Sequence, residues 1–352
     1  MGTTCACLRD FQSDELIVIN NEAHIIRQPE DRSEEIFETS SLIKLQSILR
    51  GYLCRKKGKS LLLSLPARPA LKSSQVTREF LQESNTTFPH FLNPIVTSII
   101  NKIQPFDLSE PLNDGISVTF SQAVKLENEA IYLGEWNEKL EKHGRGKQNW
   151  IDGSLYEGHW KNDRANGKGR LIHADGDIYE GEWKDDKASG HGVYIHVDSS
   201  KYEGQWLEDK QHGFGVEVWP DGAKYEGEYQ AGRKHGKGTF LWADKSSYEG
   251  EFSENNIHGF GVYKWGDGRL YKGYWKGNKM DGKGSFIWSD GRRYEGDYVD
   301  DKKQGFGVFT WPDGRKYEGQ WFDGKQHGRG IYFNATGQVM EGEWRFGKSA
   351  NN

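Results

Sequence analysis

Residues 305–321 read Gly305-Phe-Gly-Val-Phe-Thr-Trp311-Pro-Asp313-Gly-Arg-Lys-Tyr317-Glu-Gly-Gln-Trp321. Every second residue of each half is glycine or aromatic, which is the two-residue period of a β-strand. The Asp-Gly step between the halves is a turn signal. The stretch therefore predicts two short antiparallel strands joined by a turn.

The same pattern recurs along most of the chain. The motif Tyr-x-Gly-x-aromatic begins at Tyr132, Tyr156, Tyr179, Tyr202, Tyr225, Tyr248, Tyr271, Tyr294 and Tyr317, and Met340 begins a tenth copy. The first spacing is 24 residues and the other eight are 23, and Gly-x-Gly follows each of the first nine copies. A repeat of this length predicts an array in which each unit packs mainly against its neighbours.

We therefore expect an all-β repeat array, an elongated single-layer antiparallel sheet of hairpins over residues 117–352. The glycines should lie under aromatic rings, because a side chain there would lift the ring off the sheet. A column of glutamates falls on the opposite face: Glu157, Glu180, Glu203, Glu226, Glu249, Glu295 and Glu318. Basic residues that precede the tyrosines can offset this like-charge column, namely Lys201, Lys224, Arg293 and Lys316.

Composition excludes several classes of protein. The net charge of −5 over 352 residues argues against a protein that mainly binds nucleic acid. Three cysteines cannot form a disulfide scaffold, and the chain has no apolar run long enough to cross a membrane. We therefore expect a cytoplasmic protein.

The repeated histidines invite a metal hypothesis. Five of them precede a Gly-x-Gly pair: His143, His212, His235, His258 and His327. Successive repeats stand two strands apart, about 9.6 Å, whereas zinc ligands lie about 2 Å from one ion. We expect structural turn residues here, no metal or other cofactor, and no enzymatic activity.

The region before the array has a different composition and divides into three parts. Residues 1–38 are predicted to be a flexible acidic N-terminus, and residues 39–66 a basic amphipathic helix. Residues 67–116 are predicted to be a linker or extended segment, because their prolines block a long helix. Residues 79–116 are also a candidate to occupy the groove of the sheet.

The repeat unit resembles the MORN repeat. Tyr-Glu-Gly-x-Trp, then Gly-x-Gly about eleven residues after the tyrosine, then Asp-Gly, matches that family over about ten copies. The departures are Lys272 for Glu, Asp198-Ser199 and Asp244-Lys245 for Asp-Gly, and Met340 for Tyr. The resemblance implies a curved sheet with an aromatic-lined groove, and a role in scaffolds of cilia, the cell cortex or membrane junctions.

The basic helix resembles an IQ motif, although Gly58 stands at its final apolar position. The candidate residues for binding calmodulin or a centrin-like EF-hand protein are Leu45, Gln46, Leu49, Arg50, Gly51, Leu53, Arg55 and Lys56. A leucine face would enter an apolar cleft, and the Arg and Lys side chains would meet acidic rims. A helix on a lipid surface and a helix docked on the chain's own sheet remain alternatives.

The N-terminus resembles an acylation signal. Gly2 would carry myristate, and Cys5 or Cys7 palmitate, although Ala6 replaces the usual Ser or Thr. Two acyl chains are needed for stable membrane anchoring. An ordinary terminus with free thiols is the alternative.

We interpret the chain as a non-enzymatic scaffold or adaptor in a ciliary axoneme or cortical cytoskeleton, with cytoskeletal protein partners. The alternatives are an acylated membrane tether that binds phosphoinositides or links membrane to cytoskeleton, and a regulatory subunit of an enzyme on another chain. The groove residues are expected to be exposed aromatics: Trp160, Trp183, Trp206, Trp219, Trp242, Trp265, Trp275, Trp288, Trp311 and Trp321.

Overall fold

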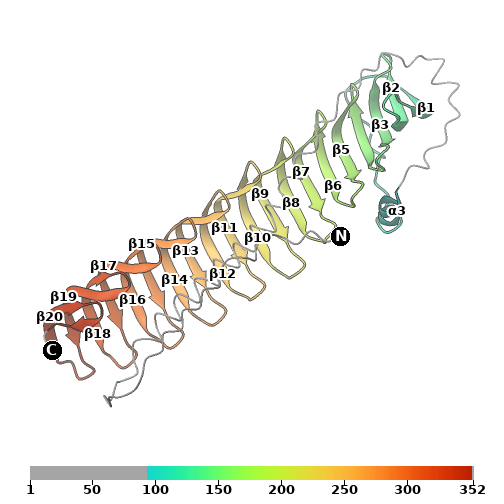
Figure 1. The fold of residues 1–352 in the computed structure, drawn as a ribbon. Coiled ribbons are helices and arrows are strands. Elements are labelled where there is room, and N and C mark those ends of the chain that lie inside the picture. The colour runs from blue at the N-terminus through green and yellow to red at the C-terminus, as the bar shows by residue number, and fades with distance from the viewer. Residues whose placement is uncertain (1–92, 351–352) are drawn as a thin grey trace, which may run out of the picture. The chain divides into compact units, whose positions relative to one another are not determined.

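A computed structural model describes residues 93–350 of the chain. Within these residues one short helix, α3 (Pro94–Ile100), precedes a sheet of 21 strands (Figure 1). The strands are β1 (Val118–Lys125), β2 (Ile131–Asn137), β3 (Lys142–Asn149), β4 (Leu155–Lys161), β5 (Arg164–Ile172), β6 (Ile178–Lys184), β7 (Lys187–Ile195), β8 (Lys201–Leu207), β9 (Lys210–Val218), β10 (Lys224–Gln230), β11 (Arg233–Leu241), β12 (Ser247–Ser253), β13 (Asn256–Lys264), β14 (Leu270–Lys276), β15 (Lys279–Ile287), β16 (Arg293–Val299), β17 (Lys302–Thr310), β18 (Lys316–Phe322), β19 (Lys325–Phe333), β20 (Val339–Arg345) and β21 (Lys348–Ser349).

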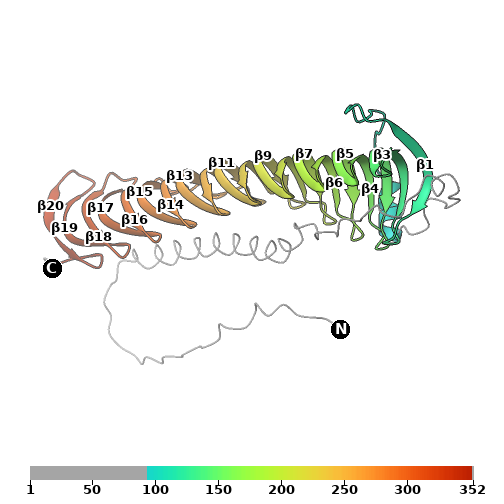
Figure 2. The ribbon, with the colours of Figure 1, turned by 90° about the horizontal axis from the view of Figure 1, so that it is seen from above.

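Each strand pairs antiparallel with the next one along the chain, from β1 with β2 to β20 with β21. Figure 2 shows the hairpins one behind another in a single layer. The predicted single-layer antiparallel sheet is therefore confirmed, with β1 as its first strand. The Asp-Gly turns between repeats are also confirmed, and Gly314 takes a φ of 91° that suits glycine.

The turns inside each repeat were not predicted. Asn162 and Asp163 join β4 to β5, with φ angles of 49° and 67°. Two positive φ angles in a two-residue loop are typical of the type I′ turn, whose twist matches that of the strands it joins. Asn, Asp and Gly tolerate this conformation best, which explains the polar pairs at these positions.

Helix α3 differs from the prediction of a linker or extended segment over residues 67–116. Pro94 starts the helix, where its missing N–H costs nothing, and the Asn93 side chain accepts a hydrogen bond from the Val96 N–H. The prolines exclude a long helix, but they permit this one of seven residues.

Each tyrosine of the motif lies over a pair of glycines on neighbouring strands. A Cβ added to Gly204 would lie 2.5 Å from the Gly215 Cα and 2.6 Å from the Tyr202 Oη. The Tyr202 hydroxyl donates a hydrogen bond to the Gln205 carbonyl at 2.9 Å, and all nine motif tyrosines make the equivalent bond. The predicted role of the glycines is confirmed.

The motif tryptophans connect successive repeats. Tyr179 makes edge-to-face contacts with Trp183 of its own repeat, at a ring-centroid distance of 5.0 Å, and with Trp206 of the next, at 5.2 Å. The Trp206 Nε1–H donates a hydrogen bond to the Gly192 carbonyl at 3.1 Å. These rings form a continuous packed layer, which we call the aromatic face.

Where the second residue of a turn inside a repeat is Asp or Asn, its side chain bonds to the preceding repeat. Asp301 Oδ1 accepts a hydrogen bond from the Met280 N–H at 2.7 Å, and Asn255 and Asn278 do the same in two other repeats. Burial raises the pKa of Asp301 to about 6, and the bond from Met280 only partly opposes this rise. The charged form of Asp301 is therefore a source of instability at neutral pH.

Replacing Asp301 with Asn should raise the free energy of unfolding at pH 7.5 by about 1 kcal/mol. Asparagine keeps the Oδ1 acceptor, as at the equivalent Asn255 and Asn278, and removes the poorly solvated charge. Urea unfolding followed by tryptophan fluorescence would measure the gain.

The pH dependence provides the control. The Asp301 pKa is about 6 in the folded chain against an ordinary 3.8, so the folded carboxyl binds a proton that the unfolded one has lost. Wild-type stability should therefore fall as the pH rises from 3.8 to about 6 and then level off. The advantage of Asp301→Asn should vanish near pH 3.5, and an equal gain at both pH values would contradict this explanation.

Candidate protein-binding face

The aromatic face does not expose the predicted groove residues. Six of the ten tryptophans are buried, with exposed fractions of 2–6%: Trp160, Trp183, Trp206, Trp242, Trp275 and Trp321. The other four are partly buried: Trp219, Trp265, Trp288 and Trp311. The expectation of exposed rings is wrong because the rings pack against aromatic side chains of neighbouring repeats. Five of them make edge-to-face contacts with the tyrosines of two repeats: Trp160, Trp183, Trp206, Trp275 and Trp321.

Lys and Arg side chains lie over several of the tryptophan rings of the aromatic face. The Lys303 Nζ lies 4.9 Å from the Trp288 ring centroid, and Arg315 lies 5.3 Å from that of Trp311. Burial lowers the pKa of Lys142 to about 8, while its Nζ lies 3.9 Å from the Trp160 ring centroid. These tryptophan rings therefore already make cation–π contacts with Lys and Arg side chains of the same chain.

The opposite face, which carries the glutamate column and which we call the Glu face, binds a segment of the chain itself. Residues 93–116, which we call the strap, lie across the Glu face of β3, β4 and β5. Val96 of α3 is fully buried against Leu155 and Ile172, and Ile99, Ile100 and Ile103 surround this cluster. The Asn93 side chain donates a hydrogen bond to the Ala174 carbonyl at 2.8 Å.

Arg170 anchors the middle of the strap. Its Nη1 donates a hydrogen bond to the Gln104 carbonyl at 2.9 Å, and the Phe106 ring lies 5.4 Å from its Cζ. Below the strap, Arg170 pairs with Glu157, and both side chains are only 5% exposed. The ion pair is therefore shielded from water by the strap.

Polar contacts continue toward the end of the strap. The His159 Nε2 donates a hydrogen bond to the Glu110 carbonyl at 2.7 Å, and the Glu110 carboxylate pairs with Lys168 at 3.1 Å. Farther along the strap, Asp114 Oδ2 lies 3.0 Å from His143 Nε2 and 3.3 Å from Lys161 Nζ. Acidic side chains of the strap thus meet basic side chains of the sheet.

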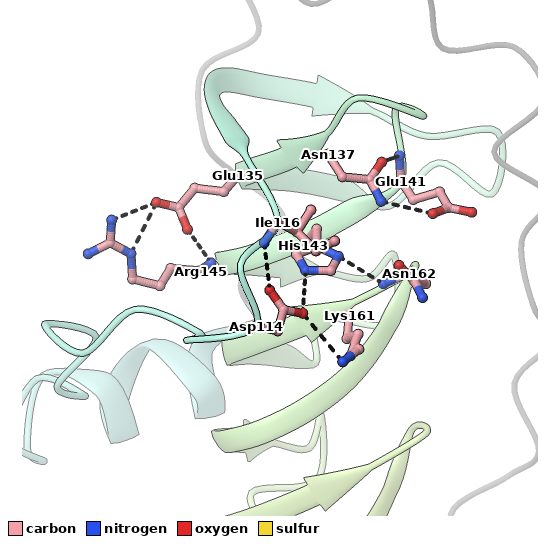
Figure 3. Close-up of polar contacts among 9 residues, drawn as sticks. All are labelled: Asp114, Ile116, Glu135, Asn137, Glu141, His143, Arg145, Lys161 and Asn162. Atoms are coloured by element: carbon pink, nitrogen blue, oxygen red, sulfur yellow. Dashed lines mark hydrogen bonds and ion pairs between the residues drawn. The ribbon is translucent and has the colours of Figure 1, made fainter.

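Figure 3 shows Asp114 held by His143, Lys161 and the Ile116 N–H. The Asn162 N–H donates to His143 Nδ1 at 3.5 Å, which leaves Nε2 as the donor to Asp114. The net effect of the surroundings is to lower the pKa of Asp114 below its ordinary value. Partial burial alone would raise this pKa, but the hydrogen bonds from Ile116, His143 and Lys161 together outweigh the effect of burial. The carboxylate therefore stays ionised in this contact.

The histidines of the Gly-x-Gly motif are not turn residues, contrary to the prediction. His143 lies in β3, and the other four lie in β9, β11, β13 and β19. His143 is buried and contacts the strap, whereas the other four stand beyond the strap. Among residues 93–350 no cluster of His, Cys, Asp and Glu side chains could hold a metal ion.

Among residues 93–350, no other segment covers the Glu face beyond the strap. The Glu203 and Glu226 side chains are 49% and 47% exposed and pair with Lys201 and Lys224, as expected, whereas Glu157 under the strap is 5% exposed. The column that contains Lys168 continues with His191, Phe214, Lys237, Phe260, Lys283, Phe306 and Arg329. Its phenylalanines therefore alternate with basic residues, one repeat apart.

The three phenylalanines, which we call the Phe ladder, are exposed to 54%, 41% and 61% for Phe214, Phe260 and Phe306. Successive members stand four strands apart, about 19 Å. Large exposed apolar side chains in a regular row are typical of a protein-binding surface. The Gly-Phe-Gly triplets at every second repeat are the sequence signal that could have identified this surface.

The predicted calmodulin-binding and lipidation residues lie outside the described residues, so the structure leaves both predictions untested. In the described part of the chain, no helix is long and apolar enough to cross a membrane.

The MORN-repeat family model matches the chain eight times, over residues 156–178, 179–201, 202–224, 225–247, 248–268, 271–292, 294–314 and 317–339. These matches cover about half of the chain. The chain belongs to the MORN-repeat family. The copies at Tyr132 and Met340 lie outside the eight matches, although their strands β2 and β20 continue the MORN sheet.

Solved structures resemble this MORN protein only loosely. The G-box domain of the microcephaly protein CPAP is 10% identical, with a TM-score of 0.29, over 65% of this chain and 100% of that one. The Drosophila melanogaster SAS-4 (dCPAP) TCP domain is 9% identical, with a TM-score of 0.27, over 54% and 96%. The Danio rerio CPAP TCP10 domain is 12% identical, with a TM-score of 0.22, over 63% and 94%. At such TM-scores these similarities support no inference, and no curated protein matches the chain.

Proposed function

We propose that this MORN-repeat protein is a non-enzymatic scaffold that binds partner proteins along the Glu face from β8 to β20. The observation that supports it is the strap, because the Glu face of β3 to β5 already binds a peptide segment. That contact combines an isoleucine cluster, ion pairs and backbone hydrogen bonds. The later repeats keep the glutamate column and, in the Lys168 column, alternate phenylalanine with basic residues from Phe214 on, and they leave these side chains exposed.

Two features of the open Glu face suit a partner that lies across many hairpins. The Phe ladder offers apolar anchors at intervals of about 19 Å, which correspond to roughly thirteen residues of an α-helix. Lys237 and Lys283 stand between the anchors, where the equivalent Lys168 already pairs with Glu110 of the strap. An acidic amphipathic segment therefore fits this face.

Combined replacement of Phe214, Phe260 and Phe306 by serine should remove the bound partners while the sheet stays folded. These side chains point to solvent, so their loss should change the free energy of unfolding by less than about 1 kcal/mol. Proximity labelling in cells, with quantitative mass spectrometry, would compare the partners of the variant and the wild type.

A matched control replaces Leu207, Val299 and Phe322 by serine, since these are 50%, 49% and 48% exposed but lie at strand ends outside the Phe ladder. The control should keep the wild-type partners. Identical partner sets for the ladder variant and the wild type would contradict the proposed function.

We also propose that residues 40–66 bind calmodulin or a centrin-like EF-hand protein, on the sequence evidence of Arg50, Arg55 and the leucine face. A peptide of these residues should bind calmodulin, and combined Arg50→Glu and Arg55→Glu should abolish binding by repulsion from the acidic rims. Calorimetry with and without calcium would test this, and absence of binding under both conditions would refute it.

The proposed location is a ciliary axoneme or cortical cytoskeleton, and membrane tethering through Gly2 is the alternative. Fractionation of tagged wild type and Gly2→Ala separates the two. Both proteins in the detergent-resistant pellet would support the cytoskeletal location, whereas release of Gly2→Ala alone from membranes would support the tether. Co-purification of an enzyme would instead support a regulatory subunit.

A further inference from the structure

We propose that residues 79–92 continue the strap along the Glu face and occupy its first open half, from β7 to β13, over Phe214 and Phe260. The inference rests on the proposed function in one respect, since it describes how that same face is regulated. Its structural basis is independent, because it derives from the strap and from the side chains that follow it.

The strap reaches the edge of the open face at its N-terminal end. Asn93 is bonded to the Ala174 carbonyl in the turn between β5 and β6. A Cβ at Gly176, in the same turn, would contact Ile95 of α3 and Val197, which follows β7. Asn93 therefore lies at the turn between β5 and β6, where the strap begins and the exposed part of the Glu face starts with Glu180.

The composition of residues 79–92 matches that of the bound strap. The strap contacts the sheet through isoleucines, Phe106 and the carboxylates of Glu110 and Asp114. Residues 79–92 read Glu-Phe-Leu-Gln-Glu-Ser-Asn-Thr-Thr-Phe-Pro-His-Phe-Leu, with two acidic residues and no Lys or Arg. Residues 79–92 therefore carry the same kinds of side chain, apolar and acidic, that the strap uses to contact the sheet.

The open face presents complementary groups in the matching order. After Lys168, which pairs with Glu110, its column continues through His191, Phe214, Lys237 and Phe260. Apolar residues of the segment would cover the exposed phenylalanines, and a carboxylate would meet Lys237 as Glu110 meets Lys168. Burial of such rings is the main gain expected from docking.

The length of the segment is sufficient. Seven strand spacings separate β6 from β13, about 34 Å, and fourteen extended residues reach about 46 Å. The segment is tethered to the strap, so its effective concentration at the face is in the millimolar range. A partner would have to displace it from Phe214 and Phe260, whereas Phe306 lies beyond the occupied half.

Photocrosslinking of the full chain tests the inference. Benzoylphenylalanine placed at Phe214, or separately at Phe260, should crosslink to residues 79–92 of the same chain, and the product should migrate as a monomer. Benzoylphenylalanine at Phe322 is the matched control and should give none of this product. Crosslinks to residues 1–78, crosslinks to a second copy, or no crosslink at all would each overturn the inference.

A second measurement uses no added group. Phe214→Ser with Phe260→Ser should accelerate chymotrypsin cleavage after Phe80 and Leu81 at least fivefold. Val299→Ser with Phe322→Ser, in β16 and β18 beyond the proposed segment, should leave the rate unchanged. Equal rates in the ladder variant and the wild type would overturn the inference. The proposed function would still stand in that case if the ladder variant had lost its partners, so the two failures are distinguishable.

Discussion

Replacing Gly204 with alanine should lower the free energy of unfolding by about 3 kcal/mol. The new Cβ would lie 2.5 Å from the Gly215 Cα and 2.6 Å from the Tyr202 Oη. The first contact is with backbone, so it cannot be relieved by a side-chain rotation. The second displaces the tyrosine ring and breaks its hydrogen bond to the Gln205 carbonyl. Urea unfolding followed by tryptophan fluorescence would measure the loss.

Gly222→Ala is the matched control, because no atom lies within 4 Å of the position of its Cβ. Gly222 has a φ of 85°, so alanine there should cost only about 1 kcal/mol for its left-handed conformation. If Gly204→Ala costs no more than this control, the aromatic face has room to adapt and the glycines are not required by close packing.

Replacing Arg170 with methionine should release the strap and lower the free energy of unfolding by about 3 kcal/mol. Methionine replaces the aliphatic part of the arginine side chain but cannot pair with Glu157, which is 5% exposed, nor donate to the Gln104 carbonyl. Lys147 still pairs with Glu157 at 3.2 Å, which limits the loss. Trypsin cleavage after Lys102 should report release, with a rise of at least tenfold.

Arg293→Met is the control for this change. Arg293 pairs with Glu295 on the open part of the Glu face, and its side chain is 52% exposed, so its loss should cost less than about 1 kcal/mol. Cleavage after Lys102 should match the wild type. An unchanged cleavage rate in Arg170→Met would mean that the isoleucine cluster holds the strap without the arginine.

Most of the sheet could be predicted from the sequence. The motif that begins at Tyr202 has a two-residue period, so it predicts a strand and the face on which each residue lies. The spacing of 23 residues predicts that every hairpin has the same neighbours, and pairing of each strand with the next follows from it. Gly204 and Gly215 could be placed under a tyrosine for the same reason. Each of these predictions depends on a pattern within one strand or on the fixed spacing between repeats.

The burial of the tryptophans could not be predicted in this way. A period of two assigns Trp206 to a face, but its exposure depends on how tightly Tyr179 and Tyr202 pack around it. Those contacts cross between repeats and depend on the twist of the sheet. The sequence pattern therefore identified the aromatic face correctly, whereas the structure shows that its rings are mostly used to hold successive hairpins together.

The position of the strap could not be predicted from the repeat pattern. Gln104 meets Arg170 and Glu110 meets His159 across 66 and 49 residues, and each contact occurs once. The repeat pattern carries no information about a segment that does not repeat. Helix α3 in turn depends on the Asn93 cap and on Pro94, which lie in a segment without a regular pattern. The repeat period defines the two faces of the sheet, but long-range packing decides which repeats the strap covers, because an apolar cluster and complementary charges coincide at β3 to β5.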